Sequence, residues 1–261
     1  SAASDVYKRQ AFNQVPPLDL RVNRLRSSPD RAAALFAERG IATAPIADCR
    51  DGLQVLEPSG DLRRWPGFSE GYWCVQDRAA QWVTPLLDPS PGQRVLDACA
   101  APGGKATHLA ELMGDEGEIW AVDRSPGRLQ RVAANAARLG CSSIQALASD
   151  ASQLAQERPE WSGRFDRILV DAPCSGLGTL ARHPDARWRV TEESVADLLK
   201  LQIELLNGLR SLLAPGGRLV YATCTIHPSE NTEQIHSWLQ AHPDLVLNSC
   251  LLYTSPSPRD H

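Results

Sequence analysis

Two periods of hydrophobic and polar positions alternate along residues 91–249. Short apolar runs are followed by stretches in which apolar residues recur every three or four positions. The apolar runs predict strands over 94–98, 118–122, 143–148, 166–170 and 218–223, and the other stretches predict helices over 105–113, 126–139, 193–213 and 228–241. This alternation is typical of an α/β fold with a mostly parallel sheet and helices on both faces.

A smaller α+β unit is predicted over residues 11–90. Its expected elements are strands over 18–22 and 53–56, a helix that Ser28 begins and Gly40 ends, a connecting loop over 65–73 and a helix over 77–87. Arg21 would lie on the opposite face of the first strand from Leu18, Leu20 and Val22. With Arg24 and Arg26 it would form a solvated face, the commoner outcome, or a local patch for phosphate groups.

The two ends are left out of the fold prediction. Residues 1–10 and 250–261 resemble translated adapter sequence, with a genuine disordered tail as the alternative. We therefore expect the native body of the protein to span about residues 11–249, truncated at both ends.

Composition narrows the class of protein. The net charge of −4 over 261 residues gives no overall basic field, so any contact with nucleic acid must be local. Seven cysteines without C-x-x-C spacing argue against a disulfide framework and against a structural zinc site. No apolar run has membrane-spanning length and no signal peptide is visible. We expect a cytoplasmic monomer that uses no metal and no membrane.

The stretch over 94–105, RVLDACAAPGGK, reads as a strand, a tight turn and the start of a helix. Gly103 and Gly104 let the backbone approach a ligand, and the first N–H groups of the helix point into the same space. The stretch has neither G-x-G-x-x-G nor P-loop spacing. Asp123 ends the next apolar run, where a carboxylate would meet ribose hydroxyls. Together these features predict S-adenosylmethionine, an adenosine-containing cofactor without a phosphate grip; the alternative is a glycine turn needed only for packing.

Polar or reactive residues follow all five predicted strands, and parallel strands bring them to one edge of the sheet. These residues are Cys99 to Lys105, Asp123, Asp150, Asp171 to Cys174, and Thr223 to Thr225. Each alone has an ordinary explanation, because such an Asp often caps a helix and a buried Cys often only packs. We assign Cys49 and Cys141 to packing, and favour packing for Cys74 and Cys99.

Two cysteines beside a methyl donor indicate methylation of a pyrimidine at carbon 5. A thiolate that adds to carbon 6 makes carbon 5 nucleophilic, and a base must then remove the carbon 5 proton before the thiolate leaves. A free thiol is only a few per cent ionised near neutrality, so the nucleophile needs a favourable setting, which the sulfonium and Lys105 would supply. Asp171 would share or give a proton at the ring nitrogen. The chemistry leaves open which cysteine attacks.

Five segments resemble the Sun/NOL1/NOP2 family of RNA cytosine-5 methyltransferases: DACAAPGGKATHLAE, AVDRSPGRL, FDRILVDAPCSGLG, RHPDARW and LVYATCTIHPSEN. The resemblance implies that Cys224 is the nucleophile and that Cys174 assists release, with Lys105 and Asp171 as further catalytic residues. The implied contacts to S-adenosylmethionine or the base are Cys99, Ala100, Ala101, Pro102, Gly103, Gly104, Lys105, Asp123, Asp150 and Asp171, and we add Arg128 from the second segment.

The resemblance further implies a Rossmann-like methyltransferase sheet, a small N-terminal unit similar to an RNA-recognition motif, and ribosomal RNA of the small subunit as substrate. The family also carries a helical RNA-binding domain that this sequence lacks, and a strand pair beyond Leu247, without which the strand over 218–223 is a bare edge. An RNA-facing loop is expected over 177–190. It holds Arg182, His183, Arg187, Trp188 and Arg189, although Trp188 packing under solvated arginines is the alternative.

Three rival functions remain at this point. The same chemistry on transfer RNA or another RNA cannot be separated by composition. A non-catalytic RNA-binding factor would need neither Cys174 nor Cys224. A nicotinamide-dependent dehydrogenase is disfavoured because the G-x-G-x-x-G spacing is absent.

Overall fold

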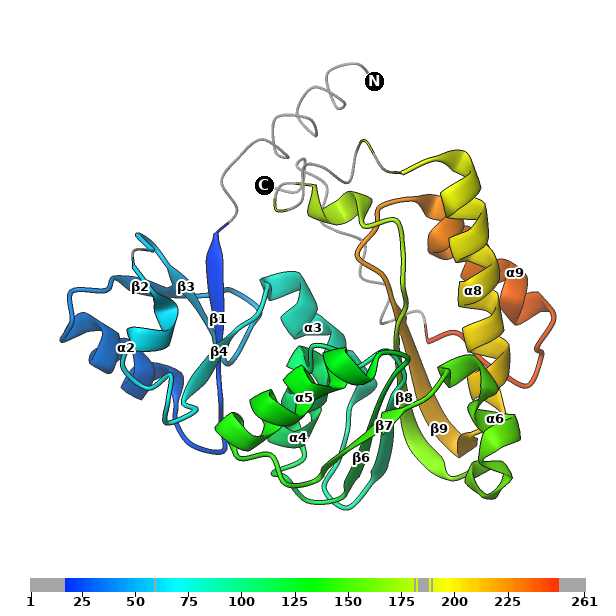
Figure 1. The fold of residues 1–261 in the computed structure, drawn as a ribbon, viewed down its shortest axis with the longest axis horizontal. Coiled ribbons are helices and arrows are strands. Elements are labelled where there is room, and N and C mark those ends of the chain that lie inside the picture. The colour runs from blue at the N-terminus through cyan, green and yellow to red at the C-terminus, as the bar shows by residue number, and fades with distance from the viewer. Residues whose placement is uncertain (1–16, 59, 181, 183–187, 189, 249–261) are drawn as a thin grey trace.

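The protein contains two β-sheets that lie side by side (Figure 1). The structure, a computed structural model, describes residues 17–58, 60–180, 182, 188 and 190–248. The two end segments set apart above, and His183, Arg187 and Arg189, lie outside the described residues.

The smaller sheet has four antiparallel strands in the order β2-β3-β1-β4. They are β1 (Leu18–Val22), β2 (Thr43–Pro45), β3 (Gly52–Val55) and β4 (Trp73–Val75), and helix α2 (Pro29–Ala37) begins after Ser28. The Ser28 hydroxyl accepts a hydrogen bond from the Arg31 N–H, as an N-cap should. Phe36 of α2 packs edge-on against Trp65 and Trp73, with ring centroids 5.9 and 5.6 Å apart. These aromatic rings fill the core between α2 and the sheet.

Strand β1 is buried on both of its faces, which corrects one expectation. Arg21 is fully buried and forms an ion pair with Glu111 of helix α4 (Gly104–Leu112), with Nη2 and Oε1 2.7 Å apart. It also donates to the Gly104 carbonyl oxygen at 2.7 Å and to the Thr107 hydroxyl at 3.0 Å. The expectation that Arg21 belongs to a solvated face or a phosphate patch is therefore wrong, because its guanidinium is buried and paired between the two sheets.

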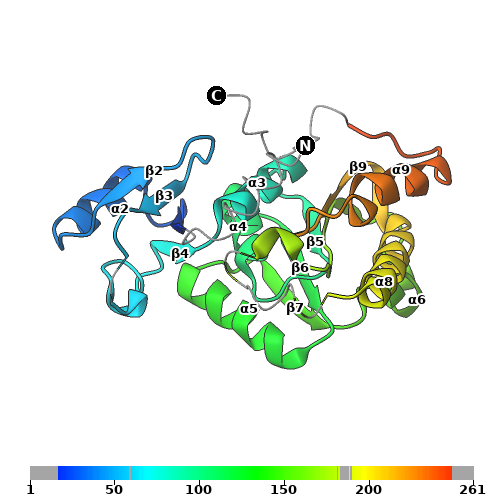
Figure 2. The ribbon, with the colours of Figure 1, turned by 90° about the horizontal axis from the view of Figure 1, so that it is seen from above.

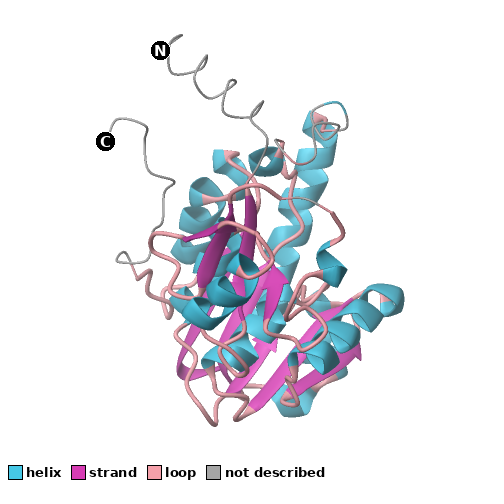
Figure 3. Ribbon diagram, turned by 90° about the vertical axis from the view of Figure 1, so that its left-hand side faces the viewer, coloured by secondary structure: helices cyan, strands magenta, loops and turns pink. Residues whose placement is uncertain are grey.

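The larger sheet has five parallel strands in the order β7-β6-β5-β8-β9. They are β5 (Arg94–Asp97), β6 (Glu118–Asp123), β7 (Ile144–Ala148), β8 (Phe165–Asp171) and β9 (Leu213–Ala222). One face carries α3 (Arg78–Leu87), α4 and α5 (Pro126–Leu139), and the other carries α6 (Leu154–Glu157) and α8 (Glu192–Arg210), with α9 (Thr232–Gln240) beside α8 (Figure 2). Figure 3 shows the strands with helices packed around them. The predicted α/β architecture with helices on both faces is confirmed.

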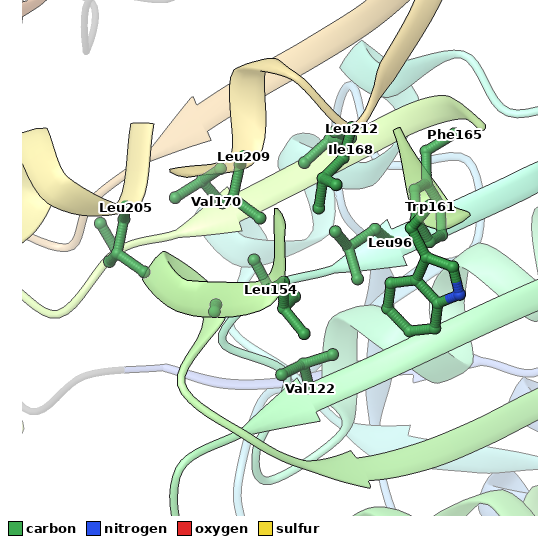
Figure 4. Close-up of a cluster of buried hydrophobic side chains, with 13 residues drawn as sticks. Leu96, Val122, Leu154, Trp161, Phe165, Ile168, Val170, Leu205, Leu209 and Leu212 are labelled. Carbon is green, nitrogen blue, oxygen red and sulfur yellow. The ribbon is translucent and has the colours of Figure 1, made fainter. Parts of the chain in front are cut away.

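Alternate side chains of the central strands enter opposite cores. Val95 packs with α3, α4 and α5, whereas Leu96, Ile168 and Val170 pack on Leu205 and its neighbours along α8 (Figure 4). Strands buried on both faces read as continuous apolar runs, which is why the sequence revealed them. No helix in the described part of the chain is long and apolar enough to cross a membrane.

The predicted bounds differ from the structure mainly around β9. This strand begins at Leu213, which pairs with Phe165, rather than at residue 218, and α8 ends at Arg210. The last predicted helix is split into a 3-10 turn over Pro228–Glu230 and α9.

The order of the larger sheet reverses between β5 and β8. The chain runs outward from β5 through β6 to β7, then crosses back to β8 and continues to β9. The loops that follow β5 and β8 therefore leave in opposite directions, and an open α/β sheet binds its ligand in the crevice between such loops.

Candidate functional site

The loop after β5 is shaped by its glycines and held by α5. Gly103 has φ of 103°, and a Cβ there would lie 3.0 Å from the Val132 Cα, so a larger residue cannot be accommodated without strain. Arg128 of α5 donates to the Ala101 carbonyl oxygen at 2.8 Å and pairs with Asp123, with Nη1 and Oδ2 3.2 Å apart. The first N–H groups of α4 lack helical acceptors and border the same space. The loop over Cys99 to Lys105 thus lies where the sequence predicted it.

Two further predicted acids stand at the ends of neighbouring strands. Asp123 ends β6 and accepts from the Ser125 N–H at 2.9 Å, and Asp150 follows β7 and accepts from the Ser152 N–H at 3.0 Å. Burial opposes the charge of Asp150, but hydrogen bonds from Ser152 and the nearby Arg124 guanidinium outweigh it and lower its pKa. Both acids therefore stabilise the turns that follow their strands. They also line one side of the crevice with carboxylates.

Asp97 is a site residue that the sequence reasoning did not single out. It is the last residue of β5, it is fully buried, and neither carboxyl oxygen has a hydrogen-bond partner among the described residues. Burial and the charge of Asp171 raise its pKa to about 7. The sequence did carry a signal for this residue, because Asp97 is an acid that ends an apolar run shortly before the glycine turn.

Lys105 and Asp171 face each other across the reversal point of the sheet. Lys105, the second residue of α4, places Nζ 2.6 Å from Oδ2 of Asp171 at the end of β8. Both side chains are only partly exposed. Two residues that are 66 positions apart in the sequence are thereby brought together, as the prediction that all five strands deliver residues to one edge requires.

Cys174 and Cys224 meet at the carboxyl ends of β8 and β9. Their sulfur atoms lie 3.1 Å apart, Cys174 is partly buried and Cys224 is exposed. The geometry allows either sulfur atom to donate the hydrogen bond between them. With Cys174 as the donor, this bond lowers the pKa of the Cys224 thiol to about 7, against partial desolvation of the sulfur and the charge of Asp171, and the Lys105 ammonium adds a smaller effect in the same direction. The pKa of Cys174 is raised correspondingly. We expected the cofactor sulfonium and Lys105 to favour the thiolate; of the protein's own groups, Cys174 lowers the pKa of Cys224 more than Lys105 does.

The backbone also holds the two cysteine loops together. The Gly178 N–H donates to the Cys224 carbonyl oxygen at 2.9 Å, and a Cβ on Gly178 would lie 2.8 Å from that oxygen. The Ala172 N–H donates to the Ala222 carbonyl oxygen at 2.9 Å. Cys174 and Cys224 are therefore fixed by their main chains as well as by the contact of their sulfur atoms.

The other described cysteines are structural. Cys49, Cys74 and Cys141 are buried, which confirms that they pack. Burial and the neighbouring carboxylates of Asp97, Asp171 and Asp123 raise the pKa of Cys99 to about 12, so its thiol is unreactive. Among the described residues no cluster of His, Cys, Asp and Glu could hold a metal ion.

Of the five residues singled out in the expected RNA-facing loop, Arg182 and Trp188 are described. Trp188 is 84% exposed, so it does not pack beneath the loop. Arg182 pairs with Asp77, with Nη2 and Oδ2 2.5 Å apart, and donates to the Pro17 carbonyl oxygen at 3.2 Å. This arginine thus links the loop to the residue before α3 and to the residue before β1.

Comparison with known proteins matches both parts of the chain to family models. Residues 84–256 match the 16S rRNA methyltransferase RsmB/F, and residues 9–61 match the ferredoxin-like domain of the same methyltransferases. The strand order β4-β1-β3-β2 agrees with a ferredoxin-like sheet.

Individual relatives agree with the family models. The chain is 48% identical to the "Probable ribosomal RNA small subunit methyltransferase B" of Synechocystis sp., over 89% of this chain and 52% of the relative. It is 42% identical to the ribosomal RNA small subunit methyltransferase B of Klebsiella pneumoniae, over 96% of this chain and 57% of the relative. The chain thus spans about half the length of the curated relatives it matches. The crystal structure of PH0851 superposes with a TM-score of 0.85 at 34% identity, over 90% of this chain and 52% of that one.

Proposed function

Because the chain belongs to the 16S rRNA methyltransferase RsmB/F family, we propose that it transfers a methyl group from S-adenosylmethionine to carbon 5 of a cytosine in ribosomal RNA. The observation that carries the proposal is the pair of sulfur atoms of Cys174 and Cys224, 3.1 Å apart beside the ion pair of Lys105 and Asp171. A protein that only binds RNA needs neither thiol. In this proposal residues 91–249 form the catalytic unit and residues 11–90 contribute to RNA binding.

The residues around the crevice fit S-adenosylmethionine chemically. The cofactor carries an ammonium and a sulfonium, and Asp97 offers two buried carboxyl oxygens without a hydrogen-bond partner in the described structure. The α4 N–H groups and the loop over Cys99 to Gly104 would hold its amino-acid end, Asp123 its ribose, and Asp150 its adenine side. When bound, it supplies the electrophilic methyl group that carbon 5 takes up.

Cys224 is proposed as the nucleophile. A pKa of about 7 leaves roughly half of its thiol ionised at neutral pH, and it is the more exposed of the two sulfur atoms. Its thiolate forms a bond to carbon 6, and the electron pair of the 5,6 double bond moves toward carbon 5 and the ring. Cys174 keeps its proton at this stage and donates it as a hydrogen bond.

Lys105 and Asp171 stabilise the base while charge builds on it. Their ion pair places a cation and a carboxylate together at the end of β8. A carboxylate that holds a proton between itself and the ring nitrogen lowers the barrier to the thiolate addition. Lys105 keeps the Asp171 side chain oriented toward the crevice.

Release of the product reverses the addition. A base must remove the proton from carbon 5, after which the double bond re-forms and the bond between Cys224 and carbon 6 breaks. Cys174 is proposed to assist this step. Its sulfur lies close enough to exchange a proton with the departing Cys224 thiolate.

The test is a trapped covalent complex. The protein and its Cys174→Ala and Cys224→Ala variants are incubated with S-adenosylmethionine and with fragments of small-subunit ribosomal RNA or transfer RNA, then run on a denaturing gel. We expect Cys174→Ala to accumulate a protein–RNA band with ribosomal RNA and Cys224→Ala to form none. A band with Cys224→Ala would exchange the two roles. A band with transfer RNA alone would change the substrate, and no band or methyl transfer with any RNA would refute the proposal.

A further inference from the structure

A buried hydrogen-bond network lies beneath the two cysteine loops. Its centre is Glu230, the last residue of the 3-10 turn, whose side chain is fully buried. One carboxyl oxygen accepts from the Ser175 N–H at 3.0 Å and from Gln202 Nε2 at 3.0 Å, and the other accepts from the Ser175 hydroxyl at 2.5 Å. Three donors from two other segments therefore converge on one carboxylate.

The proton of each hydroxyl in this network has a defined direction. Because the Ser175 hydroxyl donates to Glu230, the contact of 2.8 Å between the Ser175 and Thr225 hydroxyls must be donated by Thr225. The Thr225 oxygen in turn accepts from the His227 N–H at 3.2 Å. Ser175 directly follows Cys174, and Thr225 directly follows Cys224. This chain of hydroxyls thus joins the two cysteine loops side chain to side chain.

Helices α8 and α9 complete the network. Both amide hydrogens of Gln202 are used, one for the Pro173 carbonyl oxygen at 2.8 Å and one for Glu230. The Gln202 carbonyl oxygen accepts from Gln234 Nε2 at 2.7 Å. A fully satisfied polar network of this kind fixes a unique geometry, whereas apolar side chains of the same volume would fill the space with less directional constraint.

We propose that Glu230, through Ser175 and Thr225, is a positioning residue that holds the two cysteine loops at the separation at which Cys174 donates its hydrogen bond to Cys224. Its consequence for methyl transfer rests on the function proposed above. Its effect on the Cys224 thiol can be measured without RNA. The other charged or titratable groups near the two thiols are Lys105, Asp171 and Tyr221, and none of them belongs to the link between Ser175 and Thr225.

The experiment measures the rate of iodoacetamide alkylation at Cys224 against pH, with the modified peptide identified by mass spectrometry. Glu230→Gln keeps the shape of the side chain but replaces the oxygen that accepts from the Ser175 hydroxyl with an amide donor. Donation from Thr225 to Ser175 is then reversed. We expect the midpoint of the pH profile to move upward, toward but not beyond that of Cys174→Ala. Thr225→Val, which removes the link without altering Glu230, should shift the midpoint in the same direction.

A double variant separates positioning from general loosening. If Glu230 acts through Cys174, then Glu230→Gln combined with Cys174→Ala has the same midpoint as Cys174→Ala alone. Gln81→Met serves as a matched control, since Gln81 is a buried hydrogen-bonding amide in the contact between the sheets and should leave the midpoint unchanged. Thermal unfolding identifies any variant that fails to fold, and Thr225→Val then decides the outcome.

Three results would overturn this inference. They are an unchanged midpoint in the folded variants, an additional shift in the double variant, and an equal shift in Gln81→Met. None of them touches the proposed function, which the covalent RNA complex tests. Conversely, an absent RNA complex with an intact Glu230 effect would refute methyl transfer to RNA and leave the positioning role standing.

Discussion

Replacing Cys174 by alanine removes the hydrogen-bond donor that lies 3.1 Å from the Cys224 sulfur, and it should slow the alkylation of Cys224 at neutral pH but speed it at high pH. The pKa of the Cys224 thiol is about 7 in the intact pair. Without the donor we expect it to return toward the ordinary value of about 8.5. The sign follows from the chemistry of the thiolate, because losing a donor destabilises the anion and raises the pKa.

The magnitude follows from two opposing effects. At pH 7 the ionised fraction falls from about one half to about 3%, a loss of about 16-fold. The more basic thiolate is intrinsically about four to six times more nucleophilic for a change of about 1.5 pKa units. Compared with the wild type, the variant should therefore be alkylated about three to four times more slowly at pH 7 and about four times faster at pH 9.5. The rate profiles of the two proteins should cross at about pH 8.

The assay is alkylation of the folded protein by iodoacetamide over pH 5.5–10, with the rate at each cysteine read from its peptide by mass spectrometry. The buried Cys141, whose pKa is raised to about 12, serves as an internal control that should stay unmodified. Profiles that do not cross would show that the contact between the sulfur atoms is not what lowers the Cys224 pKa. A wild-type protein in which Cys174 reacts first, with a midpoint near pH 7, would show that the thiolate is on the other sulfur.

Two further predictions concern buried charges. Folding raises the Asp97 pKa to about 7, so the stability that its protonated form contributes to the wild type is lost as pH rises toward that value. Asp97→Asn should therefore gain stability relative to the wild type between pH 5 and pH 8, by at most about 2 to 3 kcal/mol, and an equal difference in unfolding free energy at the two pH values would contradict this. Arg21→Met should lower the free energy of unfolding in urea by about 3 to 5 kcal/mol, because it leaves Glu111 buried without its partner. The double variant Arg21→Met with Glu111→Leu should recover most of that loss, and an equal loss in the single and double variants would refute it.

The sequence predicted best where burial is simplest. All five strands of the larger sheet were found, and the central strands β5, β6 and β8 gave the clearest signal because they are buried on both faces and read as apolar runs. Strands β2 and β4 were not predicted, because three residues are too few to display a period, and Trp73 looked like part of a loop until its ring was seen in the core. Bounds near β9 shifted because pairing with β8, rather than hydrophobic pattern, decides where that strand begins.

Within the candidate site, the sequence predicted which residues gather at one edge of the sheet but not which of them contact each other. The expectation that Lys105, Asp171, Cys174 and Cys224 meet at one edge follows from parallel topology. The distance between the two sulfur atoms, and hence the role of Cys174 in activating its neighbour, depends on how two loops 50 residues apart pack. Arg21 and Asp97 were misjudged or missed because a charged residue in a strand is ordinarily exposed, and only tertiary contacts reveal that these two are not.

The insertion of Arg21 between Gly104 and Glu111 has a consequence for how this protein unfolds and evolves. Strand β1 and helix α4 share one buried polar cluster, so displacing the smaller sheet leaves the Glu111 carboxylate without its ion-pair partner. The two sheets should accordingly lose hydrogen-exchange protection in a single cooperative step. A ferredoxin-like unit grafted from a distant homologue would have to bring a matching cation at this position, which makes Arg21 and Glu111 a pair expected to change together across descendants.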